Sequence, residues 1–531
     1  MRLFTTIAGL RCHLERHRTQ KTVGLVPTMG ALHPGHLSLI ERARRENAIV
    51  VVSIFVNPLQ FGPGEDLQQY PRQLEEDQGF CEQAGVDVIF APTAVELYGD
   101  DPSDSDIPTE FTQIQPPPAM TSILCGHSRP GHFQGVATVV TKLLNLVQPD
   151  RAYFGQKDAQ QLAIIRRLVA DLNLPVTIVS CPIAREPSGL AYSSRNQYLT
   201  PEQKSQAPIL YKGLQNAQNV FQAGERDRTA LIAAVTSELS LIREIQVEYI
   251  ELVHPTTLTP LEQVEDQGLL AIAARLGSTR LIDNIRLRNR QPIIAIDGPA
   301  GAGKSTVTRL VAQQLGLMYL DTGAMYRAVT WRVLQAGIDF TDEPAIAELV
   351  SQCQISLISS GSQPQSLRVW IDGKEVTQAI RSLDVTANVS AIAAIPVVRH
   401  ELVKQQQRWA SKGGVVAEGR DIGTHVFPDA ELKIFLTASV QERARRRLQD
   451  LQDEDQGTVS LEQLEADIQL RDQRDSTRTL APLRQAADAI EINTDGLTIP
   501  EVTDKIISLY HQKALSLQDS EGESPRISIG G

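Results

Sequence analysis

The sequence predicts an α/β protein with two enzyme-sized halves, each built on a parallel β-sheet. Apolar runs rich in β-branched residues alternate with helical segments along both halves, as in sheets whose two faces are covered by helices. Two phosphate-handling motifs of different design, at residues 27–36 and 298–305, follow such runs. One nucleotide site needs only one such motif. The pair therefore predicts two enzymes fused end to end.

Elements of the first half appear in the order expected for a doubly wound domain over residues 1–175. Apolar runs predict strands at 22–27, 48–56, 86–90, 152–154 and 176–179. Apolar positions at helical spacing predict helices at 36–45 and 161–171. In such folds ligands bind beyond the carboxyl ends of the strands, so the polar segments that follow these runs are the candidate site.

The remaining segments define the rest of the domain organisation. Residues 176–285 predict a smaller α/β unit, and 286–291 predict a short polar linker. A new buried strand at 292–297 opens a second domain, predicted to cover 292–513. The last residues, 514–531, are rich in Ser, Glu and Gly and predict a disordered tail.

Composition narrows the classes of function. The chain has 531 residues, 42% hydrophobic and 21% charged, which is ordinary for a globular protein. Its net charge of −12 argues against binding to nucleic acid or to an anionic membrane. The five cysteines are scattered, without metal-site spacing, and no run has the apolar length of a membrane span. We therefore expect a cytoplasmic enzyme that acts on small phosphorylated molecules.

The first motif reads PTMGALHPGH and begins at Pro27. Met29 and Gly30 bend the end of a strand, and His33 and His36 follow one turn apart at the start of a helix. A helix N-terminus binds phosphate through unpaired N–H groups and the positive end of its dipole. Imidazoles placed there can donate hydrogen bonds to phosphoryl oxygens while the α-phosphorus of a triphosphate is attacked.

Several strings in residues 1–285 resemble pantothenate synthetase (pantoate–beta-alanine ligase). They are PTMGALHPGH, SIFVNPLQFGP, RPGHFQGVATVVTKL, FGQKDAQQL, AYSSRN and GSTRLIDN. The resemblance implies a Rossmann-like nucleotidyl-transferring fold with a HIGH-type histidine motif, like that of class I aminoacyl-tRNA synthetases. It also implies that pantoate attacks ATP to form pantoyl adenylate and pyrophosphate, and that beta-alanine then displaces AMP. The family further suggests a homodimer formed through this half.

This resemblance implies roles for individual residues. His33, His36 and Lys157 would be catalytic, with His36 as proton donor. ATP would be bound by Met29, Gly30, His33, His36, Gly155, Lys157, Asp158, Tyr192, Ser193, Ser194 and Arg195, with Asp158 on the ribose. Pantoate and beta-alanine would be bound by Asn57, Gln60 and Gln161. The chain departs from the family pattern at Cys125 and Gln156, where the family usually has Glu.

The second motif satisfies the P-loop pattern, between a buried strand and a helix. Its backbone N–H groups wrap a β-phosphate, Lys304 is the predicted catalytic residue and bridges the β- and γ-phosphates, and Ser305 reaches Mg²⁺. The predicted ATP-binding residues are Gly298, Pro299, Ala300, Gly301, Ala302, Gly303, Lys304, Ser305 and Thr306. Arginines spaced along the rest of this half favour a phosphoryl transfer between two nucleotides, because such a transfer brings two polyanions together.

Residues 290–513 resemble bacterial cytidylate kinase, a nucleoside monophosphate kinase with an NMP-binding insert and a lid. The resemblance rests on DTGAMYR, VTQAIRSLDVTANVSAIAAIPVVR, AEGRDIGTHVFPDA and RDQRDSTRTLAPL. It implies ATP-dependent phosphorylation of CMP or dCMP, with Arg447 in the lid that closes over ATP. The implied CMP-binding residues are Thr322, Arg327, Ser390, Arg399, Arg420, Asp421, Arg471, Asp475 and Arg478. Ser390, Arg399 and Asp421 would read the cytosine, and Arg471 and Asp475 would hold the ribose.

Two alternatives remain at this point. The second half could be a kinase-like nucleotide sensor or assembly module, although neither the P-loop lysine nor the arginines are missing. The first half could be a different adenylyl-transferring enzyme. The Gln60 and Gln161 pair and the RPGHF string argue against that reading, as does the absence of a KMSKS-like stretch.

Overall fold

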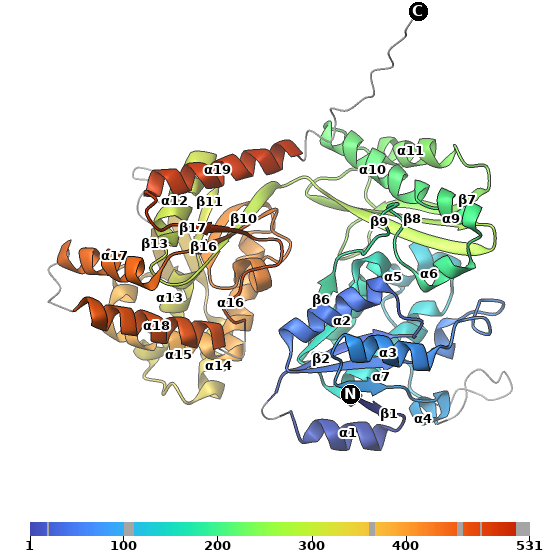
Figure 1. Ribbon diagram of the computed structural model, residues 1–531, viewed down its shortest axis with the longest axis horizontal. Helices are drawn as coiled ribbons and strands as arrows, with labels where there is room; N and C mark the ends of the chain where they lie inside the picture. Colours follow the sequence, from blue (N-terminus) through green and yellow to red (C-terminus); the bar gives the residue numbers. More distant parts are fainter. Residues whose placement is uncertain (19–20, 100–110, 360–366, 454–459, 478–480, 517–531) are drawn as a thin grey trace, which may run out of the picture. The chain divides into compact units, whose positions relative to one another are not determined.

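The structure, a computed structural model, describes residues 1–18, 21–99, 111–359, 367–453, 460–477 and 481–516. It divides into two compact units, Met1–Asn289 and Arg290–Gly531 (Figure 1). Each unit has its own sheets and its own hydrophobic core. Among the described residues, no helix is both long and apolar enough to cross a membrane.

The first unit is built on a six-stranded sheet in the order β1-β4-β3-β2-β5-β6, with every neighbouring pair parallel. The strands are β1 Arg2–Phe4, β2 Val23–Thr28, β3 Ile49–Ile54, β4 Val88–Phe90, β5 Arg151–Gly155 and β6 Thr177–Cys181. This order confirms the doubly wound fold predicted from the apolar runs.

Helices cover both faces of this sheet. Leu25 of β2 packs with α1 (Ile7–Glu15), α7 (His132–Val147) and α8 (Ala159–Asp171). Its neighbour Val26 packs on the opposite face with α2 (Pro34–Glu46) and α3 (Leu74–Gln83). Successive residues of one strand are therefore buried on opposite sides, which explains why its sequence reads as a continuous apolar run. Short segments complete this part: η1 Pro58–Gln60, α4 Ala94–Tyr98, α5 Pro118–Thr121, α6 Leu124–Ser128, η2 Gln156–Asp158 and η3 Ser194–Tyr198.

A smaller α/β part follows within the same unit. Helices α9 Pro201–Gln206, α10 Ile209–Gln222 and α11 Arg228–Leu239 accompany an antiparallel sheet of β7 Ile245–Val253, β8 Gln267–Leu276 and β9 Thr279–Arg288. The predicted boundary at 175 falls too early, because β6 pairs in parallel with β5 and belongs to the first sheet.

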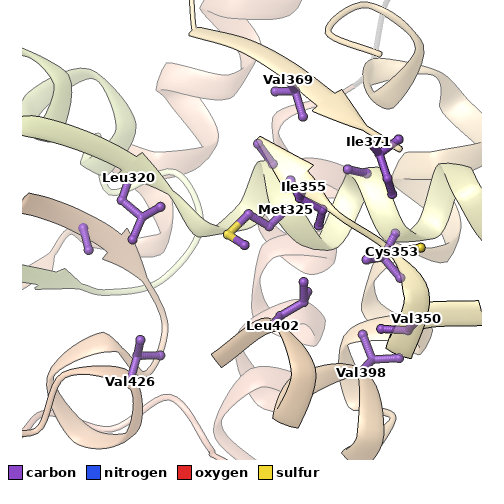
Figure 2. Packing of buried hydrophobic residues seen from close by; sticks show 14 of the residues in the cluster. Leu320, Met325, Val350, Cys353, Ile355, Val369, Ile371, Val398, Leu402 and Val426 are labelled. Carbon is purple, nitrogen blue, oxygen red and sulfur yellow. The ribbon is translucent and has the colours of Figure 1, made fainter. Parts of the chain in front are cut away.

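The second unit is built on a five-stranded parallel sheet in the order β11-β15-β10-β16-β17. The strands are β10 Gln291–Asp297, β11 Met318–Asp321, β15 Gly413–Gly419, β16 Leu432–Thr437 and β17 Ile490–Asn493. Helices α12 Lys304–Leu315 and α19 Ile499–Ser516 pack on one face. The other face packs with α13 Thr322–Ala336, α14 Glu343–Gln352 and α16 Pro396–Trp409, whose core Figure 2 shows.

Two additions flank this sheet. An insert contains the antiparallel strands β12 Ile355–Ser359, β13 Leu367–Ile371 and β14 Lys374–Glu375, followed by η4 Ala379–Arg381 and α15 Leu383–Ala394. Beyond the one-turn segment η5 (Ile422–Val426) and β16, helices α17 Val440–Asp453 and α18 Leu461–Thr477 pack through Ala444 and Leu464. They lie where the sequence predicts the lid.

Two further boundaries in the structure differ from those predicted from the sequence. The polar bridge expected at 286–291 is shorter, because residues 286–288 pair with β8 and β10 begins at Gln291, which leaves Asn289 and Arg290 between the strands. Residues 514–516, expected to belong to the tail, continue α19, which runs to Ser516. Residues 517–531 lie outside the described part of the chain.

Candidate active sites

The first unit contains a cavity of about 710 Å³ beyond the carboxyl ends of β2, β3, β5 and β6. It brings together nearly all the residues that the sequence predicts for this half. Those lining it are Met29, His33, His36, Asn57, Gln60, Gly155, Lys157, Asp158, Gln161, Tyr192, Ser193, Ser194 and Arg195. Gly30 does not line the cavity and lies in the turn between β2 and α2, which precedes the histidines.

The two histidines stand at the N-terminus of α2. His33 caps this helix, with its Nδ1 accepting a hydrogen bond from the Gly35 amide at 3.1 Å. The rings of His33 and His36 stack with centroids 4.0 Å apart. Burial, with a contribution from the Lys157 charge, lowers the pKa of His33 to about 4, and burial places the pKa of His36 well below its usual value. Both imidazoles are therefore neutral at pH 7.

One histidine nitrogen has an unmet hydrogen-bonding capacity. The Nδ1 atom of His36 is buried and has no hydrogen-bond partner among the described residues. Leaving a buried polar atom unpaired is costly, so such atoms in native sites call for a ligand or a functional explanation. His36 lines the cavity, which is where a ligand would be bound.

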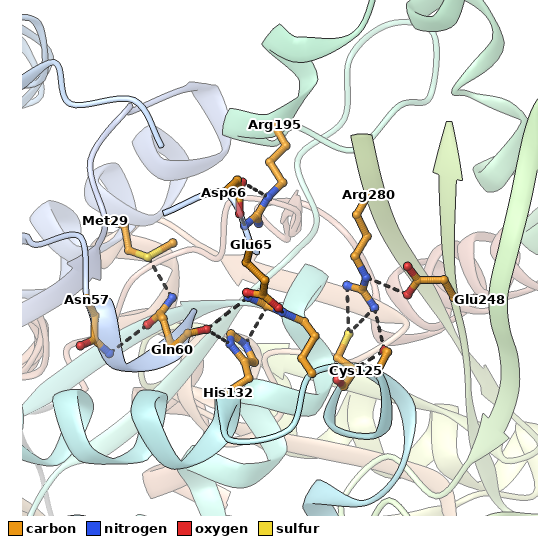
Figure 3. A network of polar contacts seen from close by, with 12 residues as sticks. Met29, Asn57, Gln60, Glu65, Asp66, Cys125, His132, Arg195, Glu248 and Arg280 are labelled. Atoms are coloured by element: carbon orange, nitrogen blue, oxygen red, sulfur yellow. Dashed lines mark hydrogen bonds and ion pairs between the residues drawn. The ribbon is translucent and has the colours of Figure 1, made fainter. Parts of the chain in front are cut away.

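A chain of amides forms another part of the cavity (Figure 3). Asn57 donates from Nδ2 to Gln60 Oε1 at 3.3 Å, and Gln60 Nε2 lies 2.8 Å from Met29 Sδ. Tyr98 OH donates to Asn57 Oδ1 at 2.8 Å, which sets the orientation of the Asn57 amide. These neutral groups can bind hydroxyls and a carboxylate without protonating a nucleophile.

Arg129 and His132 also line the cavity, although the sequence assigned them no role beyond a polar loop. Arg129 binds both oxygens of Glu65 and donates from Nη1 to His132 Nε2 at 3.1 Å. Because arginine can only donate, His132 Nε2 accepts, and its Nδ1–H donates to the Gln60 carbonyl at 2.8 Å. Burial, together with Arg129, lowers the pKa of His132 to about 4, consistent with this neutral tautomer.

Arg195, predicted to hold ATP phosphate, makes an ion pair with Asp66. Its Nε and Nη2 donate to the two carboxylate oxygens at 2.8 and 2.9 Å. Tyr70 OH lies 3.1 Å from Ser194 Oγ. Glu65, Asp66 and Tyr70 belong to the segment 61–73 between η1 and α3, which we call the acidic loop. The sequence did not predict a role for Glu65 or Asp66, because acidic residues are common in the surface loops of any protein.

Cys125, where the family usually has Glu, lies beside Arg280 (Figure 3). Its Sγ lies 3.1 Å from Tyr249 OH and 3.5 Å from both Nη atoms of Arg280. Arg280 Nε donates to Glu248 Oε2 at 2.8 Å, so Glu248 supplies the carboxylate to this arginine. At Gln156 the backbone carbonyl makes the local contact, accepting from Asn284 Nδ2 at 3.0 Å.

The second unit contains a cavity of about 2440 Å³, ample for two nucleotides. It unites the P-loop with the predicted CMP-binding residues. Those lining it are Ala300, Gly301, Ala302, Gly303, Lys304, Ser305, Thr306, Thr322, Arg327, Ser390, Arg399, Arg420, Asp421, Arg447, Arg471 and Asp475. Gly298 and Pro299 do not line it, and Arg478 lies outside the described residues.

The backbone of the P-loop adopts a conformation that requires glycine at position 298. Gly298 has φ of +150°, and a Cβ there would lie 2.1 Å from the Leu436 carbonyl oxygen. Lys304 begins α12 and donates from Nζ to the Pro299 carbonyl at 2.6 Å. Burial and the nearby Arg420 charge lower the pKa of Lys304. A bound phosphate would favour its charged form.

Ser305 and Glu418 together fit a magnesium ion. Ser305 Oγ donates to Glu418 Oε2 at 2.8 Å, and Tyr319 OH donates to the other oxygen. Burial, followed by the charge of Asp321, raises the pKa of the Glu418 carboxyl, and a cation beside it would favour ionisation. Across the described ranges no three His, Cys, Asp or Glu side chains gather as a metal site. A few oxygen donors suit Mg²⁺, which takes its remaining ligands from phosphates and water.

The part of the cavity lined by the predicted CMP-binding residues contains buried charges. Arg399 is 4% exposed, pairs with Asp421, and has an Nε atom without a partner among the described residues. Arg420 pairs with Asp475 at 3.0 Å. Arg327 donates to Thr386 Oγ1 at 3.0 Å. Burial and neighbouring guanidinium groups lower the pKa of Arg327 and of Arg471, a mutual repulsion that a polyanion would relieve.

Family models match both units. A model of pantoate-beta-alanine ligase matches residues 2–286, and a model of cytidylate kinase matches residues 294–512. A pantothenate synthetase structure from Thermus thermophilus aligns with a TM-score of 0.50 and 48% identity. The alignment covers 54% of this chain and 99% of that one.

Relatives carry both domains in one chain. A bifunctional pantoate ligase/cytidylate kinase from Trichormus variabilis is 62% identical over 532 residues, covering 97% of this chain and 99% of that protein. One from Trichodesmium erythraeum, of the same description, is 61% identical over 518 residues, covering 96% of this chain and 97% of the relative. The chain therefore belongs to the bifunctional pantoate ligase/cytidylate kinase family.

Proposed function

We propose that the first unit condenses pantoate with beta-alanine at the expense of ATP, and that the second phosphorylates CMP and dCMP with ATP. Family membership supports both activities over a sensor role for the second unit. The observation that carries the proposal is the convergence of the predicted residues on one cavity in each unit.

In the first cavity, a carboxylate oxygen of pantoate attacks the α-phosphorus of ATP. The new P–O bond forms pantoyl adenylate, and the bond from the α-phosphorus to the bridging oxygen breaks to release pyrophosphate. Charge on the departing group is balanced by Lys157 and Arg195, and the neutral His36 donates a hydrogen bond to a phosphoryl oxygen. His33, Ser193 and Ser194 hold the phosphates, with Met29, Gly155, Asp158 and Tyr192 around the nucleoside.

In the second step, the amine of beta-alanine attacks the acyl carbon of pantoyl adenylate. A C–N bond forms, the C–O bond to AMP breaks, and the amine loses a proton to solvent. Gln60, Gln161 and Asn57 orient pantoate through its hydroxyls and carboxylate. The orientation of the Gln60 amide is already fixed by its hydrogen bonds to Asn57 and Met29.

In the second cavity, a phosphate oxygen of CMP attacks the γ-phosphorus of ATP, and ADP leaves. Lys304 and the P-loop amides bind the transferring phosphates, and Arg327, Arg420 and Arg478 bind the CMP phosphate. The unpartnered Nε of Arg399, with Ser390 and Asp421, reads the cytosine edge. Arg471 and Asp475 hold the ribose, and Arg447 closes over ATP with the lid.

Mg²⁺ would be held by Ser305 and Glu418, where it would neutralise phosphate charge and orient ATP.

We also propose that the chain forms a homodimer through its first unit. Measuring the mass of the protein in solution tests whether it is a dimer.

Tryptophan fluorescence tests the kinase assignment directly. Trp331, Trp370 and Trp409 all lie in the second unit. Titration with CMP, dCMP, UMP and AMP should give saturable quenching that prefers the cytosine nucleotides, with ADP formation in a coupled assay. If no ADP forms, the alternative of a nucleotide sensor or assembly module replaces the kinase proposal.

A further inference from the structure

The turn at residues 28–32, which leads from β2 into α2, has an unfavourable backbone conformation. Gly30 has φ of +82° and Ala31 has φ of +50°. The left-handed region is unfavourable for a residue with a Cβ. The turn therefore requires contacts from elsewhere to keep this shape.

Asp77, in the first turn of α3, supplies those contacts. Its Oδ2 accepts from the Ala31 amide at 3.0 Å, and its Oδ1 accepts from the Leu32 amide at 2.7 Å. Hydrogen bonds to a carboxylate are roughly twice as strong as neutral ones. A Cβ on Gly30 would lie 2.8 Å from Asp77 Oδ2, so the glycine permits this approach.

The Asp77 carboxylate is held by backbone amides and not by a cation. It is 1% exposed and makes no ion pair within the described part of the chain. Burial raises its pKa, opposed by the two backbone hydrogen bonds. Burying a charge is unfavourable unless hydrogen bonds satisfy it, and here the two turn amides do so.

Asp77 does not line the cavity. The turn that it binds is followed directly in the chain by the two proposed catalytic histidines. Leu32, whose amide it binds, precedes the capping residue His33, and His33 stacks on His36. We propose that Asp77 is a positioning residue for ligation: it sets the turn that places His33 and His36 against the ATP phosphates. This inference rests on the proposed role of the two histidines in forming the adenylate.

Asp77→Asn in the full chain tests the proposal. The amide has one acceptor oxygen, so one of the two turn amides loses its partner. A misplacement of about 1 Å can cost 10²-fold in rate. With ATP and pantoate alone, we expect single-turnover pyrophosphate release to slow about 10- to 100-fold. The reaction of pre-formed pantoyl adenylate with beta-alanine, and the CMP kinase activity of the same chain, should keep their rates.

Three further variants complete the design. Gly30→Ala should slow the same half-reaction, because its Cβ meets Asp77 Oδ2. The exposed Glu76→Gln, beside Asp77 on α3, is the matched control and should change neither half-reaction. His36→Ala should slow adenylate formation about 10²- to 10³-fold, the scale of removing one preorganised donor.

The outcomes separate this inference from the proposed function. If His36→Ala slows adenylate formation and Asp77→Asn does not, the positioning role is overturned and the proposed function stands. If His36→Ala leaves adenylate formation unchanged, the proposed role of the histidines fails. If Asp77→Asn reduces both half-reactions equally, or only the fraction of active sites, the residue is merely structural.

Discussion

The neutral histidines of the ligase cavity give that unit a pH-dependent stability. Unfolded histidine takes up a proton near pH 6.5, whereas burial lowers the pKa of His33 to about 4. Between these values the unfolded state binds the extra proton, so the free energy of unfolding falls as the pH falls. The stabilisation is present above pH 6.5 and is lost as the pH approaches 4.

We therefore expect the melting temperature of the first unit to fall by several degrees between pH 7 and pH 5. His33→Gln should show a smaller fall, because the side chain no longer titrates. Circular dichroism melts of both proteins at several pH values measure the difference. Equal slopes for the two proteins would contradict the assignment of this dependence to His33.

Arg399 is the residue that we propose to read the base in the kinase cavity. Its planar fork pairs with Asp421 while Nε stays unpartnered, and lysine cannot reproduce this geometry. We expect Arg399→Lys to lower kcat/KM for CMP by about 10- to 100-fold, with a smaller loss for AMP. The exposed Arg408→Lys on the same helix is the matched control. Equal losses for CMP and AMP would mean that Arg399 does not read the base.

At the scale of elements, the acidic loop places carboxylates on two arginines of the ligase cavity. Asp66 pairs with Arg195, so an ATP phosphate bound by Arg195, as proposed, would compete with Asp66 for that guanidinium. A partly exposed pair of this kind is worth up to about 1 kcal/mol, or roughly fivefold in affinity. We expect Asp66→Asn to lower KM for ATP by about two- to fivefold without affecting the kinase.

Initial-rate measurements with varied ATP test this expectation. Glu75→Gln, which removes an exposed acid from α3 without touching the arginines, is the control. A rise in KM for ATP after Asp66→Asn would show that the carboxylate helps to hold the nucleotide or its arginine in place.

The sheets and the two cavities could be predicted from the sequence for a clear physical reason. Strands such as β2 and β3 are buried on both faces, so they appear as continuous apolar runs, and parallel strands bring their carboxyl ends to one edge. Motifs that follow such strands therefore meet. The P-loop and the PTMGALHPGH string also have backbone requirements that restrict their residues.

The remaining features of the fold and the sites depend on tertiary contacts, which produce no periodic pattern in the sequence. Asp66 and Asp77 are ordinary acids in the sequence, and only the fold brings them to Arg195 and to the histidine turn. Similarly, the polar residues at the end of β9 read as a linker, although they pair with β8.

At the scale of the whole molecule, the two units have separate sheets and cores. β9 pairs with β8, whereas β10 pairs with β15 and β16. A chain ending at Asn289 should therefore fold and retain ligase activity, with KM for ATP unchanged. The solved pantothenate synthetase from Thermus thermophilus, which matches this unit over 99% of its own length, supports this expectation. Steady-state assays of the shortened chain test it, and an insoluble product would show that the units stabilise each other.

The connection between β9 and β10 consists of Asn289 and Arg290. Since one message encodes both catalytic centres, a cell makes them in a one-to-one ratio and removes them together. Changes in expression then raise or lower both capacities in parallel. The balance between pantothenate formation and CMP phosphorylation is left to substrate supply and to the turnover number of each centre.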